Sequence, residues 1–77
     1  MIIWYKHALK QLEKLPQNIQ KQIKTAVERL PYGDVKALKG SYKGAYRLRV
    51  GNWRVLFFYS NDDIVIFGVK HRSKAYR

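Results

Sequence analysis

Residues 40–60 read GSYKGAYRLRVGNWRVLFFYS and carry the clearest structural signal in the chain. Two runs of strand-forming residues, Ala45–Val50 and Trp53–Tyr59, flank the pair Gly51-Asn52. Glycine and asparagine tolerate positive φ, which two-residue hairpin turns require. The stretch therefore predicts a β-hairpin with Gly51 and Asn52 as its loop.

The predicted hairpin has two chemically different faces, because side chains alternate along a strand. The loop places Arg49 opposite Arg54, and Arg47 falls on the same face. Opposed like charges on neighbouring strands cost roughly 0.2–1 kcal/mol per pair, which favours an anionic partner for this face. The alternative is that the three arginines only solubilise an outer surface. The residues predicted on the other, apolar face are Tyr46, Leu48, Val50, Trp53, Val55, Phe57 and Tyr59.

Composition limits the chain to one small, strongly basic domain spanning residues 1–77. It has 77 residues, with 16 Lys and Arg against 5 Asp and Glu, a formal net charge of +11 and 47% hydrophobic residues. The hydrophobic content is that of a folded protein rather than a basic tail. No acidic residue lies between Val35 and Asn61. This field favours a polyanion, above all nucleic acid.

Several classes of protein are excluded by what the sequence lacks. Without cysteine there is no disulfide framework and no thiolate metal site. His7 and His71 are far apart in sequence without supporting acids, so no metal or other cofactor is expected. No run approaches transmembrane length, and no helix combines a basic face with a Trp/Phe-rich one. We therefore expect a cytoplasmic protein that does not bind membranes.

Before the hairpin, the sequence predicts a short strand and two helices. Ile2–Trp4 is β-prone and could add a strand to the sheet. Apolar residues then recur with helical spacing, predicting helices over Tyr5–Leu15 and Gln17–Leu30. Pro16 suits the first turn of the second helix, and Pro31 closes it. The short connection makes the helices neighbours whose apolar stripes pack against the apolar face of the hairpin.

The remaining segments are predicted to be a loop, Tyr32–Lys43, and a third strand, Ile64–Lys70, after a turn at Ser60–Asp63. A four-residue turn would pair Tyr59 with Ile64, and a one-residue change in that loop would invert the faces of the third strand. The whole pattern predicts an α+β fold, ordered β-α-α-β-β-β, with a helical hairpin packed on one face of a small, mainly antiparallel sheet. The residues predicted on the arginine-bearing face of the third strand are Val65, Phe67, Val69 and His71.

The C-terminal residues add groups that RNA cleavage could use. His71, Arg72 and Tyr76 follow the third strand and are expected near the arginine cluster. Phosphodiester cleavage needs a base for the 2′-hydroxyl, cations for the transition state and an acid for the leaving 5′-oxygen. Arginine binds phosphate through two N–H groups, and histidine exchanges protons near neutral pH. Each residue alone has a plainer interpretation, as a strand-end histidine or a packing tyrosine.

Three blocks of sequence carry a family resemblance that extends over nearly the whole chain. They are Leu38–Gly40, Ala45–Leu56 and the terminal His71-Arg72-x-x-x-Tyr76-Arg77. The chain resembles toxins of the RelE/ParE superfamily of type II toxin–antitoxin systems, in particular the RelE branch. The resemblance implies a ribosome-dependent endoribonuclease that cleaves mRNA in the decoding site, leaving a 2′,3′-cyclic phosphate and a 5′-hydroxyl. It also implies contacts with ribosomal RNA and a cognate antitoxin protein as partner.

The same resemblance implies roles for individual residues. Arg47 and Arg49 occupy a basic pair that is often lysine in the family, and are expected to be electrostatic stabilisers. Arg54 matches the transition-state clamp. His71 or Arg72 falls near the terminal acid/base position, with His71 the preferred proton donor or acceptor. Tyr76 matches the tyrosine that stacks on or orients the substrate.

Two other functions fit the same pattern. One is a ParE-like toxin that inhibits DNA gyrase by binding, because fold alone does not determine function. The other is a catalytically inactive module that keeps only the cationic surface and binds RNA or the ribosome.

Overall fold

The predicted hairpin forms the centre of the structure. In the computed structural model, which describes residues 1–74, β3 (Tyr46–Val50) and β4 (Trp53–Ser60) pair antiparallel around Gly51-Asn52. Gly51 has a φ of +59°, as the first central residue of a tight hairpin turn requires. The register places Arg49 opposite Arg54, confirming the predicted pairing.

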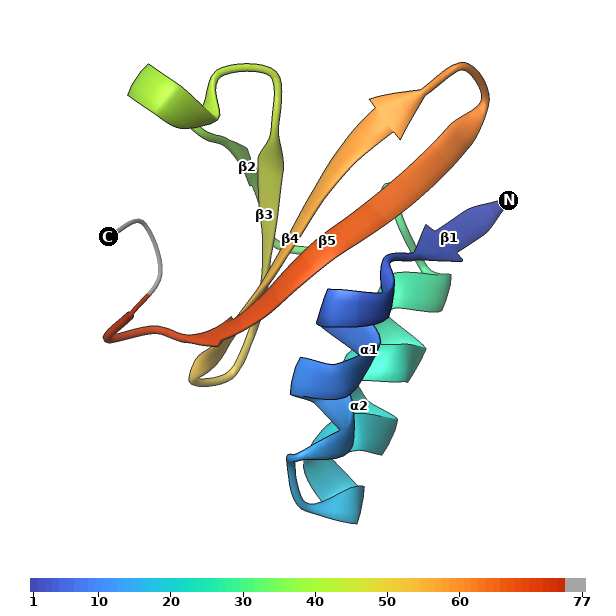
Figure 1. Ribbon diagram of the computed structural model, residues 1–77, viewed down its shortest axis with the longest axis vertical. Helices are drawn as coiled ribbons and strands as arrows, with labels where there is room; N and C mark the ends of the chain where they lie inside the picture. The colour runs from blue at the N-terminus through green and yellow to red at the C-terminus, as the bar shows by residue number, and fades with distance from the viewer. Residues whose placement is uncertain (75–77) are drawn as a thin grey trace.

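The hairpin belongs to a five-stranded sheet with the order β1-β5-β4-β3-β2 (Figure 1). The outer strands are β1 (Ile2–Trp4) and β2 (Val35–Ala37), and β5 (Asp63–His71) lies between β1 and β4. Only the β1–β5 pair is parallel among the strands of residues 1–74. The α+β class and the mainly antiparallel sheet are therefore confirmed.

One predicted loop was wrong. The segment expected to be irregular from Tyr32 to Lys43 contains strand β2 and a short 3₁₀ helix, η1 (Gly40–Tyr42). In β2, Val35 lies opposite Leu48 and Ala37 opposite Tyr46. Three residues are too few to show an alternating pattern, so only the partner strand reveals this strand.

The two helices cover one face of the sheet, as predicted. They are α1 (Lys6–Glu13) and α2 (Gln17–Glu28), slightly shorter than the predicted ranges. Tyr5 stays extended, with φ −66° and ψ 146°, because its backbone N–H donates to the carbonyl of Ile66 at 2.9 Å. In Figure 1, α1 lies in front of α2 at the lower right, and the twisted sheet extends to the upper left of the helices.

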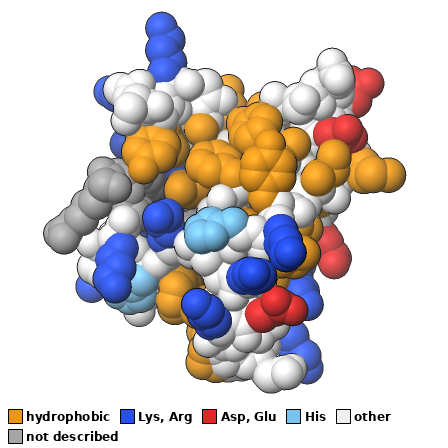
Figure 2. Space-filling model, viewed as in Figure 1, with side chains coloured by type: hydrophobic (Ala, Val, Ile, Leu, Met, Phe, Trp, Pro, Cys, Tyr) orange, Lys and Arg blue, Asp and Glu red, His pale blue; other side chains and the backbone are white. Residues whose placement is uncertain are grey.

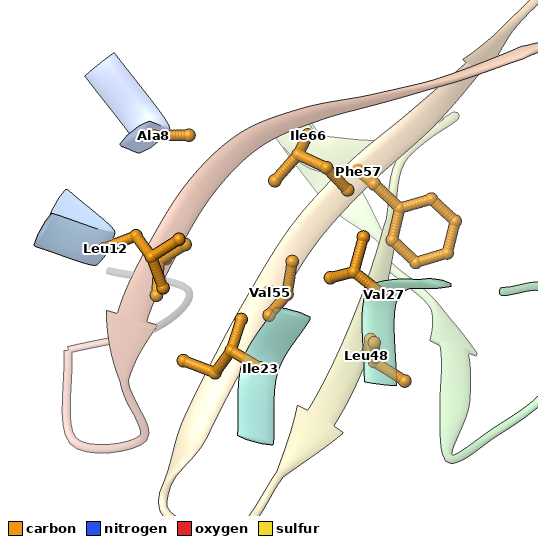
Figure 3. Close-up of a cluster of buried hydrophobic side chains, with 9 residues drawn as sticks. Ala8, Leu12, Ile23, Val27, Leu48, Val55, Phe57 and Ile66 are labelled. Atoms are coloured by element: carbon orange, nitrogen blue, oxygen red, sulfur yellow. The ribbon is translucent and has the colours of Figure 1, made fainter. Parts of the chain in front are cut away.

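The core lies between these helices and the apolar face of the hairpin (Figure 3). Both helices contribute two fully buried side chains to it, so the sequence stripes were correctly assigned to the core. At its centre, Phe57 has no exposed surface. The buried members of the cluster are Ala8, Leu12, Ile23, Val27, Leu48, Val55, Phe57, Ile66 and Val69.

A β-bulge changes the predicted pairing of β5. Tyr59 lies opposite Ile64 as expected, but the register shifts between Leu56 and Phe57, and Arg54 lies opposite Lys70. Phe67 is the extra residue. Beyond the bulge, Val69 and His71 pair with residues of the helix-covered face, so their prediction on the arginine-bearing face was wrong.

Candidate functional site

The sheet face turned away from the helices, which we call the open face, carries a cationic groove of about 650 Å³. It lies between β2, η1 and the adjoining parts of β3 and β4. Five of its lining residues are basic and none is acidic, so its chemistry suits a phosphate backbone. We call it the arginine groove; it is lined by Lys36, Ala37, Leu38, Lys39, Gly40, Ser41, Tyr42, Arg47, Arg49 and Arg54.

Strand pairing brings the three predicted arginines together. Arg47 and Arg49 are two residues apart on β3, and Arg54 lies opposite Arg49 on β4. All three line the groove, which confirms their predicted common face. The opposition of two arginines on neighbouring strands is the unfavourable arrangement expected where an anion binds.

Arg47 is held by the protein itself. Its Nη1 donates to the Asp34 carbonyl at 2.9 Å and to the Asp34 Oδ1 at 3.1 Å. The same carbonyl accepts the backbone N–H of Arg49 at 2.9 Å. The side chain of Arg47 is only 16% exposed, whereas Arg49 is an exposed residue. Arg47 is thus a fixed wall of the groove, and Arg49 is the more accessible cation.

Arg54 is fixed at the end of the hairpin. Its Nη1 donates to the carbonyl oxygens of Gly51 at 2.9 Å and Trp53 at 3.0 Å. The backbone N–H of Arg72 donates to the Asn52 carbonyl at 2.8 Å. The hairpin turn therefore holds both the Arg54 guanidinium and the start of the C-terminal segment. The C-terminal segment therefore leaves the sheet beside Gly51-Asn52.

His71 lies on the other side of the sheet from the arginine groove. It sits opposite Trp53, with ring centroids 5.3 Å apart in an edge-to-face arrangement. Its Nδ1 is 3.0 Å from the Ser73 hydroxyl. With Gln11 and Val69, these residues line a separate hollow of about 400 Å³. The structure brings Arg47, Arg49 and Arg54 together, but does not bring His71 into their groove.

The other predicted site residues occupy the chain end. Arg72 is exposed, and Tyr76 lies outside the described residues. Sequence reasoning did not place η1, whose Ser41 and Tyr42 line the arginine groove. Lys36 and Lys39 lie in the segment without acidic residues, so the sequence shows that their charge is unbalanced. Their place in the wall of the groove follows only from β2, which the sequence analysis did not predict.

The side chains of the groove can stabilise negative charge. Within residues 1–74, no group of three His, Cys, Asp or Glu side chains is placed to hold a metal ion. No helix in the described range is long and apolar enough to cross a membrane. The groove offers one restrained cation, Arg47, and an accessible one, Arg49, on the same surface, where an anion could contact both.

Comparison with known proteins defines the class. A family model described as "ParE toxin of type II toxin-antitoxin system, parDE" matches residues 2–76. The chain therefore belongs to the RelE/ParE family of type II toxin–antitoxin toxins.

Several relatives that match the chain over nearly its full length carry the RelE name. Toxin RelE3 of Methanocaldococcus jannaschii is 32% identical, over 97% of this chain and 93% of that protein. A RelB-RelE antitoxin–toxin complex from Methanococcus jannaschii superposes with a TM-score of 0.79, at 32% identity, covering 96% of this chain and 94% of that one. The archaeal RelE-RelB complex of Pyrococcus horikoshii gives a TM-score of 0.74 at 26% identity, with 96% of each chain covered. These matches confirm the two-helix, mixed-sheet architecture.

Proposed function

We propose that this toxin is an endoribonuclease that cleaves mRNA in the decoding site of the ribosome. The observation that carries the proposal is the arginine groove, which gathers five basic residues without an acid in its lining. A groove of this size and charge fits the backbone of a single RNA strand. The RelE name of the relatives supports this branch of the family.

The chemistry we propose is an in-line transesterification. The 2′-oxygen attacks the adjacent phosphorus, a P–O bond forms to it, and the bond from phosphorus to the 5′-oxygen breaks. The products are a 2′,3′-cyclic phosphate and a 5′-hydroxyl. One proton leaves the 2′-hydroxyl and one is delivered to the departing 5′-oxygen.

Arg49 and Arg54 are the proposed transition-state clamp. Their opposed guanidinium groups would share the negative charge that develops on the phosphoryl oxygens. Arg47 is restrained by Asp34, so it would contribute to the shape and positive potential of the groove rather than move to contact the substrate. Arginine stays protonated, so none of the three is assigned proton transfer.

Proton transfer is assigned to the C-terminal segment. His71 is the proposed donor or acceptor, with Arg72 as the alternative and Tyr76 as the residue that stacks on or orients a base. Because the turn at Gly51-Asn52 holds both Arg54 and Arg72, substrate would approach His71 around this end of the sheet. Because His71 lies on the helix-covered side, away from the arginine groove, its substitution tests the assignment of proton transfer more directly than substitution of Arg72 or Tyr76.

Two partners follow from this proposal. Ribosomal RNA would meet the basic side chains that lie outside the groove, several of which gather over the helical layer in Figure 2. An antitoxin of the RelB type would hold the toxin inactive, since several relatives of known structure are RelB-RelE complexes.

Primer extension on a defined mRNA, with and without programmed ribosomes, tests the proposal. The wild-type chain should cut only with ribosomes, and Arg54→Ala should lose roughly 100- to 1,000-fold in cleavage rate, the effect of removing one oxyanion donor. Arg29→Ala removes an exposed arginine outside the groove, at the end of α2; it measures the contribution of ribosome docking alone, and its loss should be much smaller than that of Arg54→Ala. His71→Ala, run beside them, reports whether proton transfer resides there. Undiminished cleavage by Arg54→Ala would refute the clamp.

Inhibition of DNA gyrase is the second candidate, because the matching family model is described as a ParE toxin. A gyrase inhibitor would act by binding and would leave mRNA intact. Supercoiling assays with purified gyrase separate the two functions: inhibition of supercoiling without ribosome-dependent cuts would replace the endoribonuclease proposal.

A further inference from the structure

A second groove adjoins the arginine groove on the open face. Its volume is about 500 Å³, and Ser41 and Tyr42 line both grooves. Five of its nine lining residues are aromatic, one is basic and none is acidic. We call it the aromatic shelf; its lining is Tyr5, Ser41, Tyr42, Lys43, Gly44, Ala45, Phe58, Tyr59 and Phe67.

Three rings of the shelf are held in fixed contact. Tyr5 meets Phe58 edge-to-face with centroids 6.1 Å apart, and Phe58 meets Phe67 at 5.8 Å. The bulge in β5 is what adds Phe67 beside Phe58. Tyr5 is anchored by the bond from its backbone N–H to Ile66, yet its residue is 48% exposed. The shelf thus presents ordered aromatic surface to solvent.

The lining chemistry favours a nucleobase over a protein helix. Grooves that dock amphipathic helices offer places for aliphatic anchors, but among residues 1–74 Ala45 is the only aliphatic residue in this lining. Proteins that bind single strands combine a cationic groove for the backbone with aromatic rings for the bases. The open face places these two parts side by side, with Lys43 extending the positive charge onto the shelf.

We propose that the aromatic shelf is a base-stacking subsite for single-stranded RNA, one that holds a nucleotide next to those in the arginine groove. The proposal rests on the proposed RNA-cleaving function and extends it from backbone binding to base binding. Stacking accepts every base, so the subsite would raise affinity without imposing a sequence.

Binding of short RNA probes with one base removed tests the subsite. The probes are 2′-O-methylated heptanucleotides, which cannot be cut, with an abasic residue placed at each position in turn. For the wild-type chain, one abasic position should weaken binding roughly 5- to 150-fold, the range measured for base stacking. In Tyr5→Leu and Phe67→Leu, the intact probe should bind that much more weakly and the abasic penalty should disappear.

Tyr32→Leu is the matched control, because Tyr32 is 79% exposed and lines neither groove. It should keep both the affinity and the abasic penalty. The side chain of Tyr5 makes no capping hydrogen bond to α1, so its replacement leaves the helix start intact, and thermal unfolding of each variant verifies this.

The outcomes separate the two proposals. If the wild-type chain binds the intact probe but shows no abasic penalty, or if both shelf variants keep it, the subsite is refuted and the arginine groove stands. If the wild-type chain binds no probe even at low salt, the subsite is refuted, and the endoribonuclease proposal is decided separately by the primer-extension assay with ribosomes. If the shelf variants keep the RNA profile but fail to bind a co-expressed RelB-type antitoxin that the wild-type chain binds, the shelf is a protein-docking surface instead.

Discussion

The two faces of the central hairpin belong to the same two strands, but one face is apolar and buried and the other is cationic and open to solvent. The helix-covered face buries Leu48, Val55 and Phe57, each with at most 1% of its surface exposed. The open face carries Arg49 and Arg54, paired across the strands against their mutual repulsion. Most of the buried apolar side chains lie on the helix-covered side, and the unfavourable charge lies on the other. We therefore expect substitutions on the helix-covered face to lower stability, and substitutions of the open-face arginines to lower activity while leaving the fold intact.

The sharpest contrast lies between two adjacent residues of β4, Phe57 and Phe58. Phe57→Ala should lower the free energy of unfolding by about 3–5 kcal/mol, because it empties the centre of the core. Phe58→Ala, on the open face, should cost clearly less, since Phe58 is only partly buried. Urea denaturation of both variants measures the difference. Equal losses would mean that the open face is as much a core as the covered one.

A smaller loss is expected where β2 joins the sheet. Gly33 has a φ of +126°, and a Cβ there would lie 3.0 Å from Leu48 Cδ1. Gly33→Ala should therefore destabilise the fold by roughly 1–3 kcal/mol, through backbone strain and the displaced leucine. Gly44→Ala is the control: its φ is also positive, at +95°, but no atom lies within 4 Å of the added Cβ. A similar loss in both would assign the cost to the backbone alone.

The ion pair at the groove wall should contribute less still. Asp34→Asn should change the free energy of unfolding by less than about 1 kcal/mol, because the Asp34 side chain is 55% exposed and solvent screens the pair. Glu28→Gln, which removes an exposed acid from α2, changes the net charge equally and controls for it. A loss well above this range, measured by thermal unfolding, would mean that Asp34 holds β2 in place rather than only restraining Arg47.

The smallest effect on stability is expected at Arg49. Arg49→Gln should alter the free energy of unfolding by no more than about 0.5 kcal/mol, as for other surface substitutions. Its effect should appear in RNA binding, where the slope of log affinity against log salt should fall by about 0.7, the value for one phosphate contact on a single strand. Lys24→Gln, on the exposed side of α2, should leave that slope unchanged. Identical slopes for both variants would place the RNA away from the groove.

Much of the fold was predictable because its signals are local. The hairpin register follows from Gly51-Asn52, and the helix stripes follow from the spacing of apolar residues. Strand β2 was missed because Val35–Ala37 gains its order only from pairing with β3. The face of His71 was misassigned because the bulge at Phe67 depends on packing between β4 and β5, which no short-range pattern records.

The candidate site divides in the same way. The three arginines were placed correctly because strand alternation alone brings them to one face. The lysine-bearing wall of the arginine groove could not be predicted without recognising β2. The aromatic shelf could not be predicted without the bulge in β5 and the backbone bond that anchors Tyr5. Residues that meet through long-range pairing, such as Tyr5 and Phe58, carry no joint signal in the sequence.

The bulge at Phe67 also gives β5 a change of phase. Upstream of it, odd-numbered Val65 lies on the open face and Ile66 faces the helices; downstream, odd-numbered Val69 faces the helices and Lys70 lies on the open face. The two halves of the strand can therefore vary as independent units, each with its own alternation. Deleting Phe67 would impose one phase on the whole strand and send either Ile66 or Val69 out of the core. Because of this one extra residue, both ends of β5 place apolar side chains against the helices, and Phe67 itself adds an aromatic ring to the open face.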